Sequence, residues 1–207
     1  PAKKILVDHH INPGSFADIV ISYPDMSSTA EMIFRLICRM GYFTDMTLEC
    51  AQCIFVGMMT DTGSFSYNSN QPEIYSIISE LIKKGVDKDE IHRRVFDNYS
   101  ESRFRMMGYM LSNKMKIYEE YGAALMCLTK EELAQFNYQP GDAEGFVNMP
   151  LSIKGIVFTA FFKEDEEKIR ISFRSQGDIP VNEFSASYFA GGGHKNAAGG
   201  QLFLSMD

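Results

Sequence analysis

Ile5-Leu6-Val7-Asp8-His9-His10 is the stretch that decides how the beginning of this chain folds. The apolar run predicts a short buried strand, and a carboxylate and two imidazoles follow where that strand would end. Side chains at the carboxyl ends of parallel strands line the crevice where α/β proteins bind ligands. Imidazole and carboxylate together suit Mn²⁺, Zn²⁺ or Fe²⁺. The stretch therefore predicts an α/β domain with a candidate metal site at its sheet, although the triplet by itself favours a surface histidine pair without function.

The composition indicates a chain with a real core and an acidic surface. Its 207 residues are 45% hydrophobic, which suits one large or two small globular domains. The formal charge of −7 argues against a protein that holds long nucleic acid by its phosphates, since that requires many Lys and Arg side chains. A small anionic substrate in a local basic pocket remains compatible with this charge. No stretch approaches the ~20 apolar residues of a membrane span.

The four cysteines are Cys38, Cys50, Cys53 and Cys127. Cys50 and Cys53 form a C-x-x-C pair, but a zinc or redox role would need a second pair or a suitable turn. We interpret all four as reduced core thiols, which predicts a cytoplasmic protein.

Hydrophobic periodicity predicts helices in the first half of the chain. Ser28 and Glu31 are expected to form a capping box that starts a helix over 28–40. Residues 46–59 are almost all apolar and predict a buried helix, with a strand over 54–56 as the alternative. Further helices are expected from Pro72 to Gly85 and, capped by Asp87 and Glu90, through Val95.

The pattern becomes richer in strands near residue 115. Ser100 is expected to open a connector helix that ends near Asn113. The later elements expected are strands over 115–119 and 123–128, a short helix capped by Thr129 and Glu132, a hairpin over 155–163 and 168–174, a helix over 181–189 and a strand over 201–205. The fold class predicted is therefore α/β: a parallel-sheet domain with helices over 1–99, a connector over 100–118, and a smaller α+β domain with a mixed sheet over 119–207.

Three further motifs contain residues suited to a binding site. Asp61, in Thr60-Asp61-Thr62-Gly63, emerges from the buried segment and is placed like a ligand at a pocket rim, or is an ordinary turn residue. Gly191-Gly192-Gly193-His194 lets a backbone approach an anion closely and adds a donor, or is a flexible loop. Arg174-Ser175 suits phosphate, or is a solvated strand end.

Together these motifs resemble the DHH phosphoesterase family, and its NrnA-type members closely. Asp8-His9-His10 resembles the motif that names the family, and Asp61 resembles its fourth motif. Arg174-Ser175 and Gly191-Gly192-Gly193-His194, followed by Ala197-Ala198-Gly199, resemble the DHH-associated C-terminal domain. The matches run in the family's order over nearly the whole chain.

The resemblance implies a two-metal centre, usually of Mn²⁺, at which water is activated for attack on phosphorus. It implies that His9 and Asp61 share one metal ion, that Asp8 supports His9, and that His10 lies beside the scissile phosphate. Asp8 and His10 would be the catalytic residues. The residues implied to hold the substrate are Arg174, Ser175, Gly192, Gly193 and His194, with Asn148 and Arg103 as further substrate-side candidates.

The chain departs from the family in one respect. The family's first two motifs, which supply the other metal ligands, precede the triplet and are not found here. We therefore expect the C-terminal portion of an enzyme, with a partial metal site and no activity by itself. An exposed hydrophobic sheet edge near residues 4–8 is also expected.

The function predicted is that of a metal-dependent phosphoesterase acting on short oligoribonucleotides (nanoRNA) or 3′-phosphoadenosine 5′-phosphate, with an active site between two domains. Another DHH phosphodiesterase, including one that cleaves linear dinucleotides, or an exopolyphosphatase is the rival within the family. A non-catalytic nucleotide- or RNA-binding fragment is the alternative of another class. The expected partners are a short RNA or nucleotide and neither long nucleic acid nor membrane; a homodimer is left open.

Overall fold

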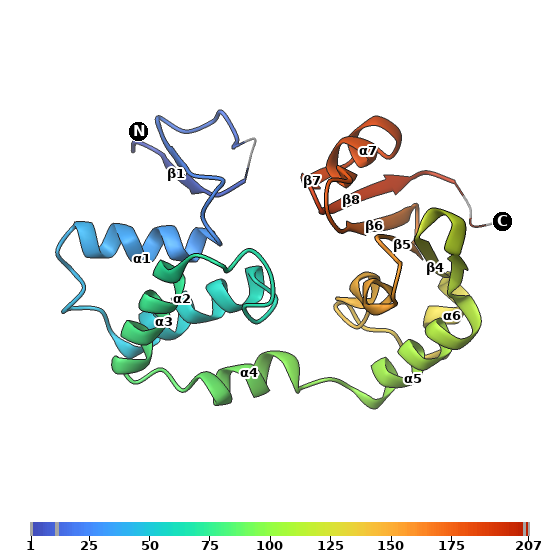
Figure 1. Cartoon of the computed structure of the whole chain (residues 1–207), viewed down its shortest axis with the longest axis horizontal. Coiled ribbons are helices and arrows are strands. Elements are labelled where there is room, and N and C mark those ends of the chain that lie inside the picture. The colour runs from blue at the N-terminus through green and yellow to red at the C-terminus, as the bar shows by residue number, and fades with distance from the viewer. Residues whose placement is uncertain (1, 11–12, 205, 207) are drawn as a thin grey trace. The chain divides into compact units, whose positions relative to one another are not determined.

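The computed structural model describes residues 2–10, 13–204 and 206. The chain divides into two compact units, Pro1–Asn98 and Tyr99–Asp207. Figure 1 traces the elements of both in chain order. No helix in the described ranges is both long enough and apolar enough to cross a membrane.

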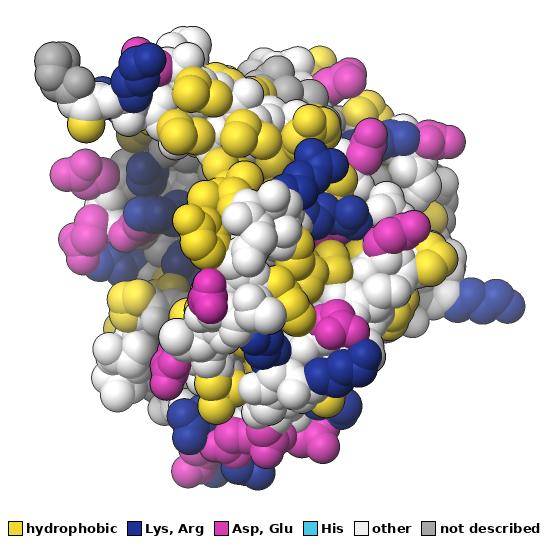
Figure 2. All heavy atoms as spheres, turned by 90° about the vertical axis from the view of Figure 1, so that its left-hand side faces the viewer, with side chains coloured by type: hydrophobic (Ala, Val, Ile, Leu, Met, Phe, Trp, Pro, Cys, Tyr) yellow, Lys and Arg dark blue, Asp and Glu magenta, His cyan; other side chains and the backbone are white. Residues whose placement is uncertain are grey.

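Unit 1 begins with a pair of parallel strands. β1 (Ile5–Asp8) pairs with β2 (Ile19–Ser22), and Asp8 lies opposite Ser22 at the carboxyl end of both. The predicted first strand is confirmed, but it is not buried, since Ile5 is exposed and the next three residues are half-buried. Strand β2 was not predicted. Ile5 is 61% exposed and Val20 is 45% exposed, which confirms the hydrophobic exposure expected near residues 4–8. Figure 2 shows hydrophobic side chains gathered at the upper part of this face of unit 1.

Four helices follow β2 in the described part of unit 1: α1 (Thr29–Arg39), α2 (Leu48–Asp61), α3 (Pro72–Lys83) and α4 (Lys88–Phe96). All four correspond to predicted helices, and the alternative of a strand over 54–56 is wrong. α2 is the central helix, because Phe55, Met58 and Met59 are almost completely buried within it. Asp87 accepts hydrogen bonds from the backbone of Asp89 and Glu90 and so caps α4.

The capping box predicted for α1 is only half correct. The Ser28 hydroxyl accepts a hydrogen bond from the Glu31 backbone N–H at 3.0 Å, as expected for an N-cap. The Glu31 carboxylate, however, binds Ser27 and Arg35 instead of the backbone of Ser28. Glu31 is completely buried. Through its hydrogen bonds to Ser27, Glu31 therefore anchors the segment that precedes α1.

Unit 2 is built around a mixed sheet with the strand order β3-β4-β5-β6-β8-β7 among its described residues. β4 and β5 are parallel and the other neighbours are antiparallel. This confirms the predicted mixed sheet. The strands are β3 (Lys116–Tyr118), β4 (Ala123–Leu128), β5 (Phe158–Glu164), β6 (Ile169–Ser175), β7 (Gly192–His194) and β8 (Ala197–Leu202).

Helices cover both faces of this sheet. α7 (Val181–Tyr188) packs on one face, where Ile171 and Phe173 are buried. The other face buries Phe161 beneath the elements α5 (Glu101–Tyr109), the π-helical turn η1 (Met110–Lys114), α6 (Lys130–Gln135) and η3 (Phe146–Ser152). The side chains of β6 alternate between these two faces.

Two predictions for this half of the chain are corrected. The expected connector helix is part of unit 2, because Met106 of α5 and Met110 of η1 are fully buried in its core. The last strand begins at Ala197 instead of Gln201, since it pairs with the glycine strand β7. Both differences come from packing between distant segments, which local periodicity does not contain.

Candidate functional site

His9 lies directly after β1 and is 7% exposed. Its Nδ1 lies 3.2 Å from the carbonyl oxygen of Met26. Because a carbonyl only accepts hydrogen bonds, Nδ1 is the nitrogen that carries the hydrogen and Nε2 the one with the lone pair. Nε2 lies 3.6 Å from Oδ2 of Asp61, the last residue of α2. The strand and the helix therefore bring the two predicted metal ligands together.

The separation of these two atoms fits a shared divalent ion. Ligand atoms bonded at about 2.1 Å to one ion stand roughly 3.0–3.4 Å apart for octahedral or tetrahedral angles. The observed 3.6 Å is a few tenths of an ångström wider. A neutral imidazole and a carboxylate are also the donors that Mn²⁺, Zn²⁺ and Fe²⁺ accept. The donor pair therefore fits a metal ion in both chemistry and spacing.

The Asp8 side chain binds the side chain of His10. Its Oδ1 accepts hydrogen bonds from Nδ1 of His10 at 2.6 Å and from the His10 backbone N–H at 3.1 Å. The side-chain hydrogen bond from His10 holds the pKa of Asp8 below its ordinary value. Asp8 therefore orients His10, and the Met26 carbonyl orients the His9 ring; the support of His9 by Asp8 stays a prediction.

The segment that presents the Met26 carbonyl is anchored by Glu31. The Glu31 carboxylate accepts hydrogen bonds from the backbone N–H of Ser27 at 2.9 Å and from its hydroxyl at 2.7 Å. Ser27 directly follows Met26, so the bond to His9 depends on this anchor. Sequence reasoning missed both contributions, because a backbone carbonyl has no sequence signal and Glu31 fitted a capping box.

Thr62 fixes the end of the helix that carries Asp61. Its hydroxyl donates to the Met58 carbonyl at 2.7 Å and accepts from the Phe65 backbone N–H at 3.0 Å. Thr62 is completely buried, whereas the Asp61 side chain is 45% exposed. The chain then turns through left-handed residues at Gly63, Ser64 and Phe65. Asp61 therefore stands on a rigid turn with its carboxylate accessible.

In unit 2 the register of the sheet aligns Arg174 with His194. Arg174 of β6 lies opposite Ala197 of β8, which in turn lies opposite His194 of β7. Directly paired residues share a face of the sheet, so both side chains belong to one face, about 10 Å apart across two strand spacings. The small side chain of Ala197 separates them. The structure thus brings together two of the predicted substrate-binding residues.

Ser175 occupies a different position from the one expected. It is the residue after Arg174 and therefore belongs to the opposite face, where it is 6% exposed. Its hydroxyl donates to the Ile179 carbonyl at 2.7 Å and accepts from Nδ2 of Asn196 at 2.8 Å. Ser175 therefore stabilises the turn that follows β6, and we do not retain it as a phosphate ligand.

The second and third glycines of the triplet open the strand β7 instead of forming a loop, and Gly191 directly precedes it. A Cβ at Gly191 would lie 1.9 Å from the Gly199 carbonyl oxygen, and one at Gly193 would lie 2.5 Å from that of Ala197. These two positions therefore require glycine for packing against β8. Gly192 differs, because a Cβ there meets no described heavy atom within 4 Å. Gly192 and Gly193 remain predicted substrate contacts through their backbone.

Arg103 and Asn148 also receive positions in unit 2. The Arg103 guanidinium donates to the carbonyls of Gly141, Asp142 and Glu144, and it is 8% exposed. This removes it from direct contact with a substrate and corrects the prediction. Asn148 is exposed at η3 and remains a predicted contact.

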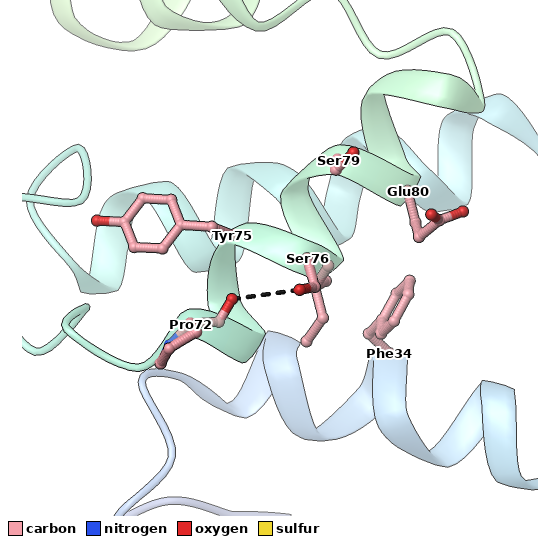
Figure 3. A pocket seen from close by; sticks show the side chains of 7 residues that line it. Phe34, Pro72, Tyr75, Ser76, Ser79 and Glu80 are labelled. Carbon is pink, nitrogen blue, oxygen red and sulfur yellow. Dashed lines mark hydrogen bonds between the residues drawn. The ribbon is translucent and has the colours of Figure 1, made fainter.

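Two hollows lie within the individual units. The first, of about 510 Å³, is an open depression beside α1 and α3, lined by residues that include Phe34, Tyr75 and Glu80 (Figure 3). The Glu80 carboxylate already pairs with Lys83 at 2.7 Å, and the other lining residues are aromatic, aliphatic or hydroxyl-bearing. The second, of about 240 Å³, lies on the β5–β6 face of unit 2 and contains Arg174.

Residues 121–204 match the family described as the DHHA1 domain. The chain is 35% identical, over 94% of its length and 58% of the relative's, to an uncharacterised MG371 homolog from Mycoplasma pneumoniae. It is 30% identical, over 96% of its length and 58% of the relative's, to a bifunctional oligoribonuclease and PAP phosphatase NrnA from Thermus thermophilus. A crystal structure of an exopolyphosphatase-related protein from Bacteroides fragilis is 58% identical, with a TM-score of 0.94, and the match covers 100% of this chain and 60% of that one.

These similarities extend over both units of the chain, which contain the His9–Asp61 pair and the mixed sheet. The chain belongs to the DHH family, with NrnA-type proteins among its relatives, and contains a DHHA1 domain. It spans about 58% of the length of the two curated relatives named above.

Proposed function

We propose that this chain is part of a metal-dependent phosphoesterase that hydrolyses short oligoribonucleotides and 3′-phosphoadenosine 5′-phosphate, and that the metal is Mn²⁺. The observation that carries the proposal is the approach of His9 Nε2 to Asp61 Oδ2, at 3.6 Å, with the tautomer of His9 set by the Met26 carbonyl. The relative from Thermus thermophilus, named for both activities, supports the choice of substrates.

In this proposal each role belongs to named residues of this chain. His9 and Asp61 would hold the ion, and when bound it would lower the pKa of a water and stabilise charge on the phosphoryl oxygens. Asp8 keeps the His10 ring in one orientation through their 2.6 Å hydrogen bond. His10, held this way, positions or protonates an oxygen of the reacting phosphate. Arg174 and His194 bind a phosphate of the substrate from one face of the sheet.

The net charge of −7 supports short substrates, because long strands are held by extended basic surfaces. The same proposal places the protein in the cytoplasm, which the four free thiols support. It includes no membrane partner.

The test is hydrolysis by the protein in its full natural length. 5′-Phosphorylated diribonucleotides and 3′-phosphoadenosine 5′-phosphate are supplied with MnCl₂ or with EDTA. We expect EDTA to abolish turnover, and Asp61→Asn to lower kcat at least about 100-fold, since a neutral amide binds a divalent ion poorly. Asp45→Asn, which changes an acidic residue elsewhere in unit 1, is the matched control. Equal turnover with EDTA, or by Asp61→Asn, would contradict the proposal.

Metal binding separates this proposal from a non-catalytic module. Titration calorimetry with Mn²⁺ should show binding to the wild type that Asp61→Asn weakens. Nucleotide binding without any turnover, and equally strong with EDTA, would favour the binding module over the enzyme.

A further inference from the structure

The hollow of about 240 Å³ on the β5–β6 face of unit 2, here called the β5–β6 pocket, concentrates positive charge. Three of its lining residues are the cations Lys163, Arg170 and Arg174, against one carboxylate, Glu144. The whole chain carries a net charge of −7, so the net charge of this lining is opposite in sign to that of the chain. Such a local excess favours an anionic ligand. The other lining residues include Tyr138, Ser172, Phe161 and Val147.

Lys163 and Arg170 are directly opposite each other on β5 and β6. Two like charges at paired positions of an antiparallel ladder destabilise the sheet. Each cation has one hydrogen-bond partner. Lys163 Nζ donates to the neutral Tyr138 hydroxyl at 2.7 Å, and Arg170 Nε donates to the Asp165 carboxylate at 2.7 Å, which offsets part of the Arg170 charge. An anion bound beside both would relieve their repulsion further.

The pocket wall is held in place before any ligand binds. Arg103 donates to three carbonyls of the wall segment 141–144, and its guanidinium stacks on Tyr99 at 4.0 Å and on Phe146 at 4.9 Å. Because the wall is already ordered, ligand binding loses little free energy to ordering it. Arg103 is thus a positioning residue of the pocket.

The spacing of the cations indicates a ligand with more than one anionic group. Arg174 and Arg170 are four residues apart on β6, which is roughly 13 Å of strand. Ser172 lies between them on the same face and offers a hydroxyl. A single phosphate reaches one end of this row. A ligand with two separated phosphates reaches both ends.

We infer that the β5–β6 pocket binds a second phosphate of the nucleotide substrate through Lys163 and Arg170, at a distance from the phosphate bound by Arg174. The nucleotide identity of the ligand rests on the proposed function. The observations that indicate an anion site, which are the charge, the strand register and the preformed wall of the pocket, do not depend on the proposed function.

The experiment measures binding without turnover. 3′-Phosphoadenosine 5′-phosphate, here called the bisphosphate, and adenosine 5′-monophosphate are titrated by calorimetry into the protein in its full natural length. EDTA is present throughout. Lys163→Gln/Arg170→Gln should weaken binding of the bisphosphate about tenfold and binding of the monophosphate less than twofold. The matched control, Lys116→Gln/Lys154→Gln, removes two exposed charges of the same unit outside the pocket lining and should change neither affinity.

A second variant gives a gain that misfolding cannot imitate. Glu144→Gln removes the carboxylate of the pocket but keeps the backbone carbonyl that Arg103 binds. It should tighten binding of the bisphosphate two- to threefold. Equal losses for both ligands in the double variant, or no loss, would overturn the inference, as would unchanged binding in Glu144→Gln.

Kinetics distinguish this inference from the proposed function. If the enzyme is active, the double variant should raise KM for the bisphosphate with little change in kcat; an unchanged KM despite weakened binding would overturn the assignment to the substrate. If the wild type shows no hydrolysis, the proposed function fails, while the selective loss of bisphosphate binding still supports the pocket as a phosphate site.

Discussion

Replacement of the buried Glu31 carboxylate by an amide, Glu31→Gln, should weaken both the folding of unit 1 and metal binding at His9. Glu31 accepts four hydrogen bonds: two from Ser27 and two from the guanidinium of Arg35. Each carboxylate oxygen receives two of them. Glutamine offers one accepting oxygen and one donating nitrogen, so two of these donors would face another donor.

The size of the destabilisation follows from these contacts. Loss of one partner of a buried ion pair costs about 3–5 kcal/mol. The Arg35 side chain is 35% exposed, so solvent screens part of that loss. We therefore expect the free energy of unfolding to fall by about 2–3 kcal/mol, measured by urea denaturation followed by circular dichroism. Glu80→Gln, which breaks an exposed pair with Lys83, is the control and should change it by less than about 1 kcal/mol.

The effect on metal binding is indirect. Release of Ser27 frees the neighbouring Met26 carbonyl, which orients the His9 ring. Loss of such an outer partner typically lowers metal affinity 10–100-fold. Titration calorimetry of Mn²⁺ should therefore show about tenfold weaker binding in Glu31→Gln and unchanged binding in Glu80→Gln. Lower stability with unchanged Mn²⁺ affinity would refute the coupling between this segment and His9.

Three further outcomes follow from the structure. Gly191→Ala should lower the free energy of unfolding by about 3 kcal/mol or more, and Gly192→Ala by less than about 1 kcal/mol, because only the first Cβ collides with the backbone; equal losses in urea denaturation would contradict this. Burial opposes ionisation of Glu132, but hydrogen bonds, among them that of Lys114, outweigh it and lower its pKa, so its contribution to stability is present above the ordinary carboxyl pKa and disappears as the pH falls through the folded-state pKa. Denaturation from pH 7 to pH 3 should show a shallower loss in Glu132→Gln, and an unchanged profile would exclude this role. Val20→Lys should reduce light scattering by concentrated protein, because it places a charge on an exposed strand; undiminished scattering would mean that β2 does not drive association.

Elements with strong local signals were predicted well from the sequence. The Thr129–Glu132 capping box is present in full at the start of α6. The apolar segment 46–59 lies almost entirely within the central helix α2, which begins at Leu48. The strand β7 was not predicted, because glycine has a low strand propensity and pairs here only through its fit against β8. Strand β2, with only Ile19–Ser22, is too short to give a clear pattern.

The candidate site was predictable in its side chains but not in their connections. His9 and Asp61 were paired through a family resemblance, and the structure places them 3.6 Å apart. The hydrogen bond of Asp8 to His10 was not predicted, because spacing alone does not decide which neighbouring imidazole a carboxylate reaches. The alignment of Arg174 with His194 depends on the register of three strands, which is a non-local property.

The parallel pairing of β4 with β5 has a consequence for how this protein can vary. Parallel neighbours need a long crossover, and here it runs through residues 129–157. The same crossover supplies the wall of the β5–β6 pocket, while the sheet supplies the cations. Insertions or deletions in the crossover would therefore reshape the ligand space and leave the strand pairing unchanged. Homologues and designed variants could exchange this one segment to accept ligands of different size on the same charged floor.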